Sequence, residues 1–160
     1  MIKLSASSST NSRLPVSSSP VLALATALPA AAQFAKPEDA IKYRKAVFTV
    51  MGTHFGRVAA MANGKAPFDA KVAADSAQIA TSMSMLPYVA FLPGTDTGDT
   101  RAKASIWTDM DKVKSLAGKM QEEMAKLNVA AKTGNIDTIK AAVGETGKAC
   151  KACHDDYRKE

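Results

Sequence analysis

The sequence predicts an all-α protein, folded as an antiparallel up-down four-helix bundle. Four segments carry apolar residues at helical spacing, and no segment alternates apolar and polar residues over a useful length. Two of the three connections between these segments are short, as in an up-down bundle. The chain has 160 residues, with 46% hydrophobic and 22% charged residues, so its size and composition fit one globular domain.

The first 32 residues differ from the rest, and we expect them to be a signal peptide that is removed. This segment contains Lys3 and Arg13 but no acidic residue, and it has eight Ser among its first nineteen positions. An apolar stretch, Pro20–Pro29, is followed by the small residues Ala30–Ala32, so cleavage is expected after Ala32. A transit peptide or a disordered tail is the alternative, because the stretch before the apolar segment is long and rich in Ser.

The first helix is expected over residues 37–62. Pro37 suits a first helical turn, and the two acidic residues after it favour the positive end of the helix dipole. Asn63 and Gly64 are typical of the position where a helix ends. The residues that repeat every seven positions and form the buried seam are Ile41, Phe48, Phe55 and Ala62, with Met51 and Val58 between them.

Three further helices are expected over residues 69–85, 105–132 and 136–159. Asp69 can cap the second helix and Pro87 ends it. The third has apolar residues alternately four and three positions apart, from Ile106 to Ala131, which is a seam of period 3.5. The segment 87–103 is predicted to be a loop, and a loop of that length in a compact domain often has a function.

The last predicted helix contains the sequence C-K-A-C-H at residues 150–154, the signature that attaches c-type haem. Residues i, i+3 and i+4 of a helix share one face, so Cys150 and Cys153 can reach the two vinyl groups along one porphyrin edge. His154 lies beside them and can supply an axial nitrogen to the iron. Together with Tyr157, these residues extend the apolar stripe, so we expect the haem in the bundle core. Export is consistent with this, because c-type haem is attached outside the bacterial cytoplasm.

Three other roles for the cysteines compete with haem attachment. A redox dithiol belongs to a strand–helix context, which this sequence lacks. A disulfide between cysteines three residues apart in a helix would be strained. A zinc site lacks ligands, because His54 is the only histidine besides His154.

The exported part of the chain resembles cytochrome c′, the class II c-type cytochromes, over residues 33–160. The segments that carry the resemblance are Gln33–Ala40, Tyr43–Arg44, His54–Arg57, Ala90–Phe91, Pro93–Thr95, Trp107, Lys132–Gly134, Ala141–Gly144 and Cys150–Asp155. The resemblance implies one covalent haem c, bound through Cys150 and Cys153, with His154 as the proximal ligand. It also implies a homodimer formed through the first two helices.

The resemblance assigns residues to the two faces of the haem. Phe48 is implied to fill the distal face, so that the iron is five-coordinate and high-spin and admits nitric oxide or carbon monoxide. Arg158 is implied to line the proximal side, and it follows His154 by four residues, about one helical turn. Some relatives are low-spin and carry a methionine ligand on the first helix, for which Met51 is the alternative here. His54 is off the seam and is expected near the surface rather than on the iron.

Further haem contacts are expected from residues that lie before the motif in the sequence. Arg44 falls on the apolar seam of the first helix, where a charge needs a partner, and a haem propionate would supply one. The resemblance places a haem contact at this position and at the next, Lys45. It also places contacts in the loop before the third helix, at Thr100 and Arg101.

We therefore expect a periplasmic haem protein that exchanges electrons with redox partner proteins, binds nitric oxide, or does both. A peroxidase-like enzyme is the less favoured alternative, because peroxide chemistry needs distal polar groups where Phe48 is expected. Positive and negative charges are mixed along the helical faces despite a net charge of +6, so no nucleic-acid partner is expected. No apolar run approaches the roughly 20 residues that cross a bilayer.

Overall fold

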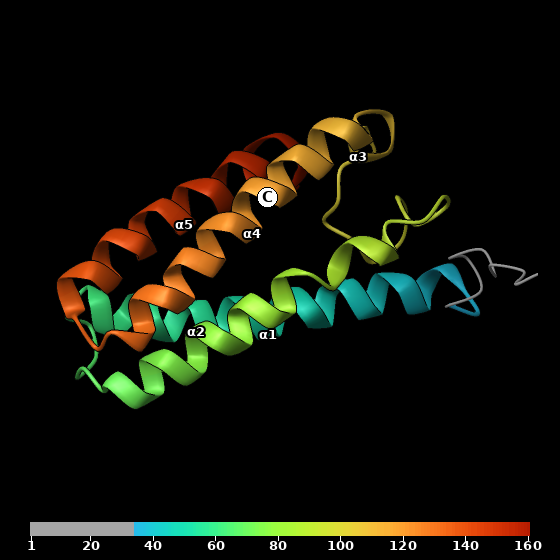
Figure 1. Ribbon diagram of the computed structural model, residues 1–160. Coiled ribbons are helices and arrows are strands. Elements are labelled where there is room, and N and C mark those ends of the chain that lie inside the picture. Colours follow the sequence, from blue (N-terminus) through green and yellow to red (C-terminus); the bar gives the residue numbers. More distant parts are fainter. Residues whose placement is uncertain (1–33) are drawn as a thin grey trace, which may run out of the picture.

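The computed structural model describes residues 34–160, and it confirms the all-α four-helix bundle (Figure 1). Its helices are α1 (Pro37–Ala62), α2 (Ala70–Ser84), α3 (Ser105–Thr108), α4 (Met110–Lys132) and α5 (Ile136–Tyr157), with one 3₁₀ turn, η2 (Pro87–Ala90). The four long helices alternate in direction along the bundle (Figure 1). The predicted signal peptide, residues 1–32, lies outside the described residues.

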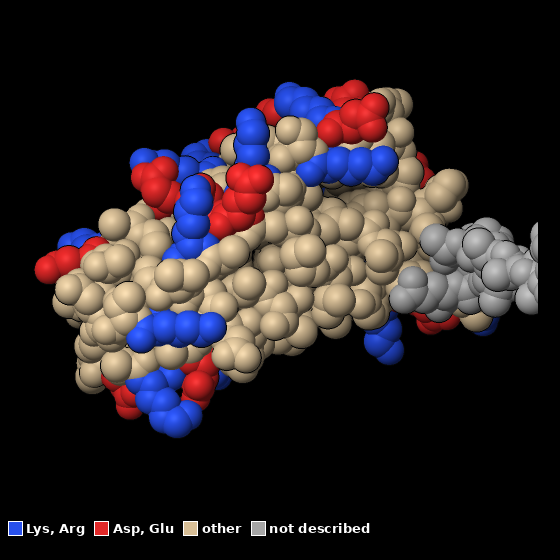
Figure 2. All heavy atoms as spheres, in the orientation of Figure 1, with Lys and Arg blue, Asp and Glu red and all other residues tan. Residues whose placement is uncertain are grey.

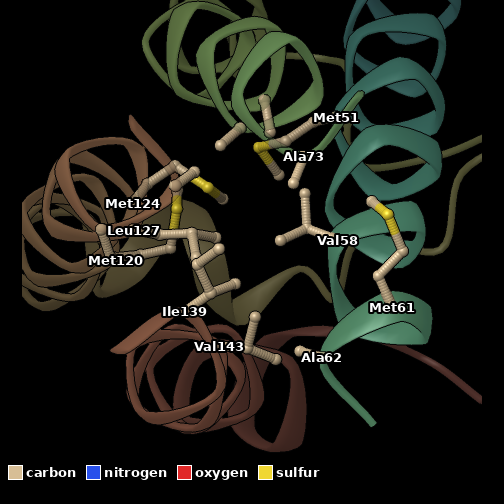
Figure 3. Close-up of a cluster of buried hydrophobic side chains, with 14 residues drawn as sticks. Met51, Val58, Met61, Ala62, Ala73, Met120, Met124, Leu127, Ile139 and Val143 are labelled. Atoms are coloured by element: carbon tan, nitrogen blue, oxygen red, sulfur yellow. The ribbon is translucent and has the colours of Figure 1, made fainter. Parts of the chain in front are cut away.

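The four long helices form a closed ring. α1 packs against α2 and α5, and α4 packs against the same two helices. The apolar seams meet in the middle, where Val58, Met124, Leu127 and Ile139 are fully buried and point toward one another (Figure 3). Burial of these side chains is the main source of stability in a bundle of this kind.

Capping residues set where two of the helices begin. The Asp69 side chain accepts a hydrogen bond from the Val72 amide at 2.9 Å and caps α2, as predicted. The Asn135 side chain accepts from the amides of Asp137 and Thr138 and so caps α5. The chain can turn tightly between α4 and α5 because Gly134 adopts a φ of +67°, a conformation that favours glycine.

The predicted helix over 105–132 is wrong in one respect, because it is interrupted at Asp109. The backbone of Asp109 departs from helical geometry, which separates the four-residue α3 from α4. Its carboxylate accepts a hydrogen bond from the hydroxyl of Tyr157 at 3.2 Å. Ile106, Val113 and Tyr157 form a second, smaller apolar cluster beside the main core. The period-3.5 seam therefore serves two clusters, and the helix breaks within the smaller one, between Ile106 and Val113.

The remaining differences concern helix ends. α2 is one residue shorter than predicted at each end, and η2 occupies the start of the segment predicted to be a loop. α5 ends at Tyr157 rather than 159, because Arg158 is extended and pairs with Ala102. Among residues 34–160, no helix is both long enough and apolar enough to span a membrane.

Candidate haem-binding site

A cavity of about 890 Å³ lies at the α3 end of the bundle, between α1, α4, α5 and the segment that follows η2. All nine residues predicted for the haem site line it: Arg44, Lys45, Phe48, Thr100, Arg101, Cys150, Cys153, His154 and Arg158. The rest of its wall is largely apolar, and no Asp or Glu of the described residues is part of it. A mainly apolar cavity of this size with a few cations is suited to a flat apolar group that carries negative charges at one edge.

The motif lies on the last two turns of α5. Cys150 and Cys153 are half-buried on the cavity wall, and both thiols are free, so the alternative disulfide is not formed. Burial raises the pKa of both thiols. His154 is accessible from the cavity, and its pKa is lowered by burial and by the nearby Arg158 guanidinium. A lowered pKa favours the neutral imidazole, which is the form that ligates a metal.

Phe48 is the first member of a chain of aromatic rings. It meets Tyr88 edge to face at a centroid distance of 6.5 Å, and Tyr88 stacks on Phe91 at 6.2 Å. Phe91 in turn meets Trp107 at 5.9 Å. Tyr88 lines the cavity, and burial raises its pKa, so the phenol stays protonated at neutral pH. Tyr88 is not among the residues predicted from the sequence, since the resemblance placed haem contacts in this loop only at Thr100 and Arg101.

Arg44 is buried, with 2% of its surface exposed, and its guanidinium is bonded to the end of η2 and to the segment after it. It donates to the carbonyl of Ala90 at 3.0 Å and to the hydroxyl and carbonyl oxygens of Thr95 at 2.7 and 2.5 Å. A fourth bond, of 2.8 Å, goes to the hydroxyl oxygen of Thr100. The guanidinium carbon also lies 4.9 Å from the ring centroid of Phe91. The protein itself thus supplies much of the compensation that this buried charge needs, and burial lowers the pKa of Arg44.

The other predicted cations lie at the rim of the cavity. Lys45 pairs with Asp99 at 2.5 Å, and both side chains are exposed. Arg101 donates from Nε to the carbonyl of Lys159 at 2.9 Å. Arg158 follows α5 in an extended conformation, yet its amide still donates to the carbonyl of His154 at 3.0 Å. It therefore lies beside the histidine, as expected, although not on a continuing helix.

Met51 and His54, the two residues considered as other ligands of the iron, differ in their relation to the cavity. Met51 is 8% exposed, lines the cavity and belongs to the main core, whereas His54 does not line the cavity. Across the described residues, 34–160, no three His, Cys, Asp or Glu side chains are grouped so that they could hold a metal ion. Met120 and Met124 of α4 also line the cavity, although their spacing predicts them only as members of the seam.

Comparisons with known proteins agree with this geometry. The family model described as Cytochrome C′ matches residues 39–158. A cytochrome c′ from Rubrivivax gelatinosus is 54% identical over 129 residues, which covers 80% of this chain and 100% of that protein. Its crystal structure has a TM-score of 0.76, with 55% sequence identity, and covers 79% of this chain and all of that one. A ferrous variant of cytochrome c′ from Alcaligenes xylosoxidans, solved with bound NO, has a TM-score of 0.73 at 42% identity and covers 79% of this chain and 98% of that one.

Proposed function

The chain belongs to the cytochrome c′ family, and from that premise we propose that it is a periplasmic haem protein whose five-coordinate iron transfers electrons, binds nitric oxide, or does both. Its cofactor is covalently attached haem c. The observation that carries the proposal is one cavity lined by both the Cys150–His154 motif and Phe48. The motif proposed to hold the haem and the bulky apolar side chain of Phe48 therefore face the same space.

The residues on the cavity wall fit this cofactor. In the proposal, Cys150 and Cys153 form the two thioethers and His154 is the axial ligand, supported by their spacing on α5 and their place on the wall. The acid-free lining with cations at the rim suits the haem propionates. The nearby haem contacts are assigned to the four residues Arg44, Lys45, Thr100 and Arg101.

Bound haem supplies an iron that carries one electron and coordinates small gases. The chain determines which ligands reach it. We assign Phe48 to the distal face, where an apolar ring excludes bulky ligands and offers them no hydrogen bond. The proximal side is assigned to Arg158, beside His154. The Alcaligenes xylosoxidans relative solved with bound NO supports nitric oxide as the gas.

We propose a binding and transfer role rather than catalysis. Peroxide chemistry needs a polar group that moves a proton on the open side of the haem. Among the described residues, His154 is the only histidine on the cavity wall, and it is assigned as the ligand. Tyr88 also lines the wall, and burial raises its pKa, so its phenol stays protonated and does not act as a base at neutral pH.

The protein is also proposed to form a homodimer through α1 and α2. Val72, Ile79 and Leu86, seven residues apart, are 43%, 37% and 38% exposed on and just after α2. Figure 2 shows charged side chains along α4 and at the start of α2, with an uncharged band between them. A row of exposed apolar side chains on a helix favours a second copy as its partner.

Export to the periplasm is proposed on the pattern of residues 1–32. The purified protein should then begin at Gln33, which intact-mass spectrometry would show. A mass that includes residues 1–32 would refute the export proposal.

The experiment that tests the distal assignment measures carbon monoxide affinity in the ferrous protein. Phe48→Ala should raise the affinity about tenfold or more, because relief of a steric contact of about 1.4 kcal/mol corresponds to a factor of ten. Phe68→Ala is the matched control, since this ring is 40% exposed and is not part of the cavity wall. Equal affinities in the two variants would refute the role of Phe48. A spectrum that changes from low-spin to high-spin in Met51→Leu would instead identify Met51 as a sixth ligand and the protein as an electron carrier only.

A further inference from the structure

The last residues of the chain pair with the segment before α3. Ala102 and Arg158 form an isolated antiparallel bridge. The amide of Lys103 donates to the carbonyl of Tyr157 at 2.9 Å, and the amide of Lys159 donates to the carbonyl of Arg101 at 2.7 Å. We call this pairing of residues 101–103 with 157–159 the tail clasp. It holds a chain terminus that would otherwise be free to fray.

The tail clasp is connected to α1 through one hydroxyl oxygen. Thr100 Oγ1 accepts a hydrogen bond from the Arg44 guanidinium at 2.8 Å and another from the Ala102 amide at 3.1 Å. Arg44 is buried and held by three further bonds to residues 90 and 95, so it is a fixed anchor. The position of Ala102 therefore depends on the Thr100 hydroxyl oxygen. The position of Arg158, which pairs with Ala102, depends on it as well.

The tail clasp also fixes two positive charges beside the axial histidine. Arg158 is bridged through its backbone, and Arg101 is tied through Nε to the carbonyl of Lys159. Both residues line the same cavity as His154. The carboxylate of Asp155, the residue after His154, is engaged by Lys151 at 2.6 Å. Two positive charges therefore act on the proximal side of the site.

We propose that Thr100 is a positioning residue whose hydroxyl holds the tail clasp in place, so that Arg101 and Arg158 keep their positive charges beside His154 and raise the reduction potential of the haem. The inference rests on the proposed ligand role of His154. Reduction of ferric haem removes one positive charge from the site. Fixed cations nearby therefore favour the reduced form, and cations that move into solvent favour it less.

Variants at Thr100 and at the chain end separate this positioning role from a direct effect of Thr100 on the haem. Thr100→Val keeps the shape and removes the acceptor, Thr100→Ser restores it, and Thr97→Val is a matched control at an exposed residue of the same loop. A chain that ends at Arg158 keeps Thr100 but loses both bonds of Lys159. All are prepared as the haem-loaded protein. Spectroelectrochemical titration gives the potential, and hydrogen exchange is followed at the amides of Lys103 and Lys159.

We expect Thr100→Val to speed exchange at both amides about five- to tenfold, as loss of one hydrogen bond does, and to lower the reduction potential. The shortened chain should lower the potential in the same direction, while Thr100→Ser and Thr97→Val should match the wild type. Unchanged exchange in Thr100→Val would overturn the role of Thr100 in the clasp. A potential that falls in Thr100→Val but not in the shortened chain would also overturn it, because Thr100 would then act on the haem directly. If His154 did not ligate the iron, the absorption spectrum of the wild type would show it. That result would be independent of the Thr100 variants.

Discussion

Replacement of Arg44 by methionine tests whether this buried cation holds the segment over the haem site. The guanidinium donates four hydrogen bonds, to oxygens of Ala90, Thr95 and Thr100, and it is 2% exposed. Methionine fills similar space but donates no hydrogen bond, so these partly buried acceptors lose their donor. Each hydrogen bond to a charged group contributes about 1.5–3 kcal/mol, but removal of the charge also removes its desolvation cost.

We therefore expect Arg44→Met to lower the free energy of unfolding by about 3–5 kcal/mol. For a domain of this size, that corresponds to a fall in Tm of about 10–20 °C. The free energy of unfolding of Arg44→Lys should lie between those of the wild type and Arg44→Met. An ammonium group keeps the charge but cannot reach all four acceptors. Denaturant unfolding of the haem-loaded protein, followed by circular dichroism, gives the free energies.

The neighbouring Lys45→Met is the matched control for Arg44→Met. Apart from its proposed contact with the haem, Lys45 forms an exposed pair with Asp99, so its loss should cost no more than about 1 kcal/mol. If Arg44→Met costs as little as Lys45→Met, the reasoning is refuted, and the hydrogen bonds of Arg44 do not organise the loop.

Three further predictions concern the core, the dimer and the charge pairs. Leu127→Ala should lower the free energy of unfolding by about 2–5 kcal/mol because the side chain is fully buried, whereas Val129→Ala, at a residue 67% exposed, should change it by less than about 0.5 kcal/mol; denaturant unfolding that gives equal losses would contradict this. Ile79→Lys should convert the proposed dimer to a monomer in analytical ultracentrifugation and Val129→Lys should not; a wild type that is already monomeric would refute the dimer proposal. The hydrogen bond and charge of Lys112 lower the pKa of Asp156, so this pair stabilises the folded protein above the ordinary carboxyl pKa and less as pH falls through the lowered one. The difference in unfolding free energy between wild type and Asp156→Asn should therefore shrink as the pH falls below about 4. A difference that stays constant with pH would contradict a stabilising pair between Lys112 and Asp156.

The helices could be predicted because each is amphipathic within its own sequence. The seam of α1 and the Cys150–His154 motif depend on spacings within one helix, which the sequence displays directly. The cavity could be anticipated for the same reason, because the motif continues the apolar stripe of α5.

Features that depend on distant partners could not be predicted in this way. The acceptors of Arg44 lie 46 to 56 residues further along the chain, and sequence spacing does not show which oxygens will face it. The break at Asp109 coincides with a hydrogen bond from Tyr157, 48 residues away, although the apolar seam continues through the break. The tail clasp joins residues more than fifty positions apart, and Arg158 by itself predicts only a continuing or frayed helix end.

The absorption spectrum of the purified ferrous protein, recorded before and after addition of nitric oxide, tests the central claim most directly. We predict a c-type Soret band with broad high-spin features that shift when the gas is added, because we propose that His154 is the only axial ligand that the protein supplies. Sharp, split α and β bands that nitric oxide leaves unchanged would contradict this, since a second side chain would then occupy the sixth position. Absence of a Soret band would contradict haem attachment at Cys150 and Cys153.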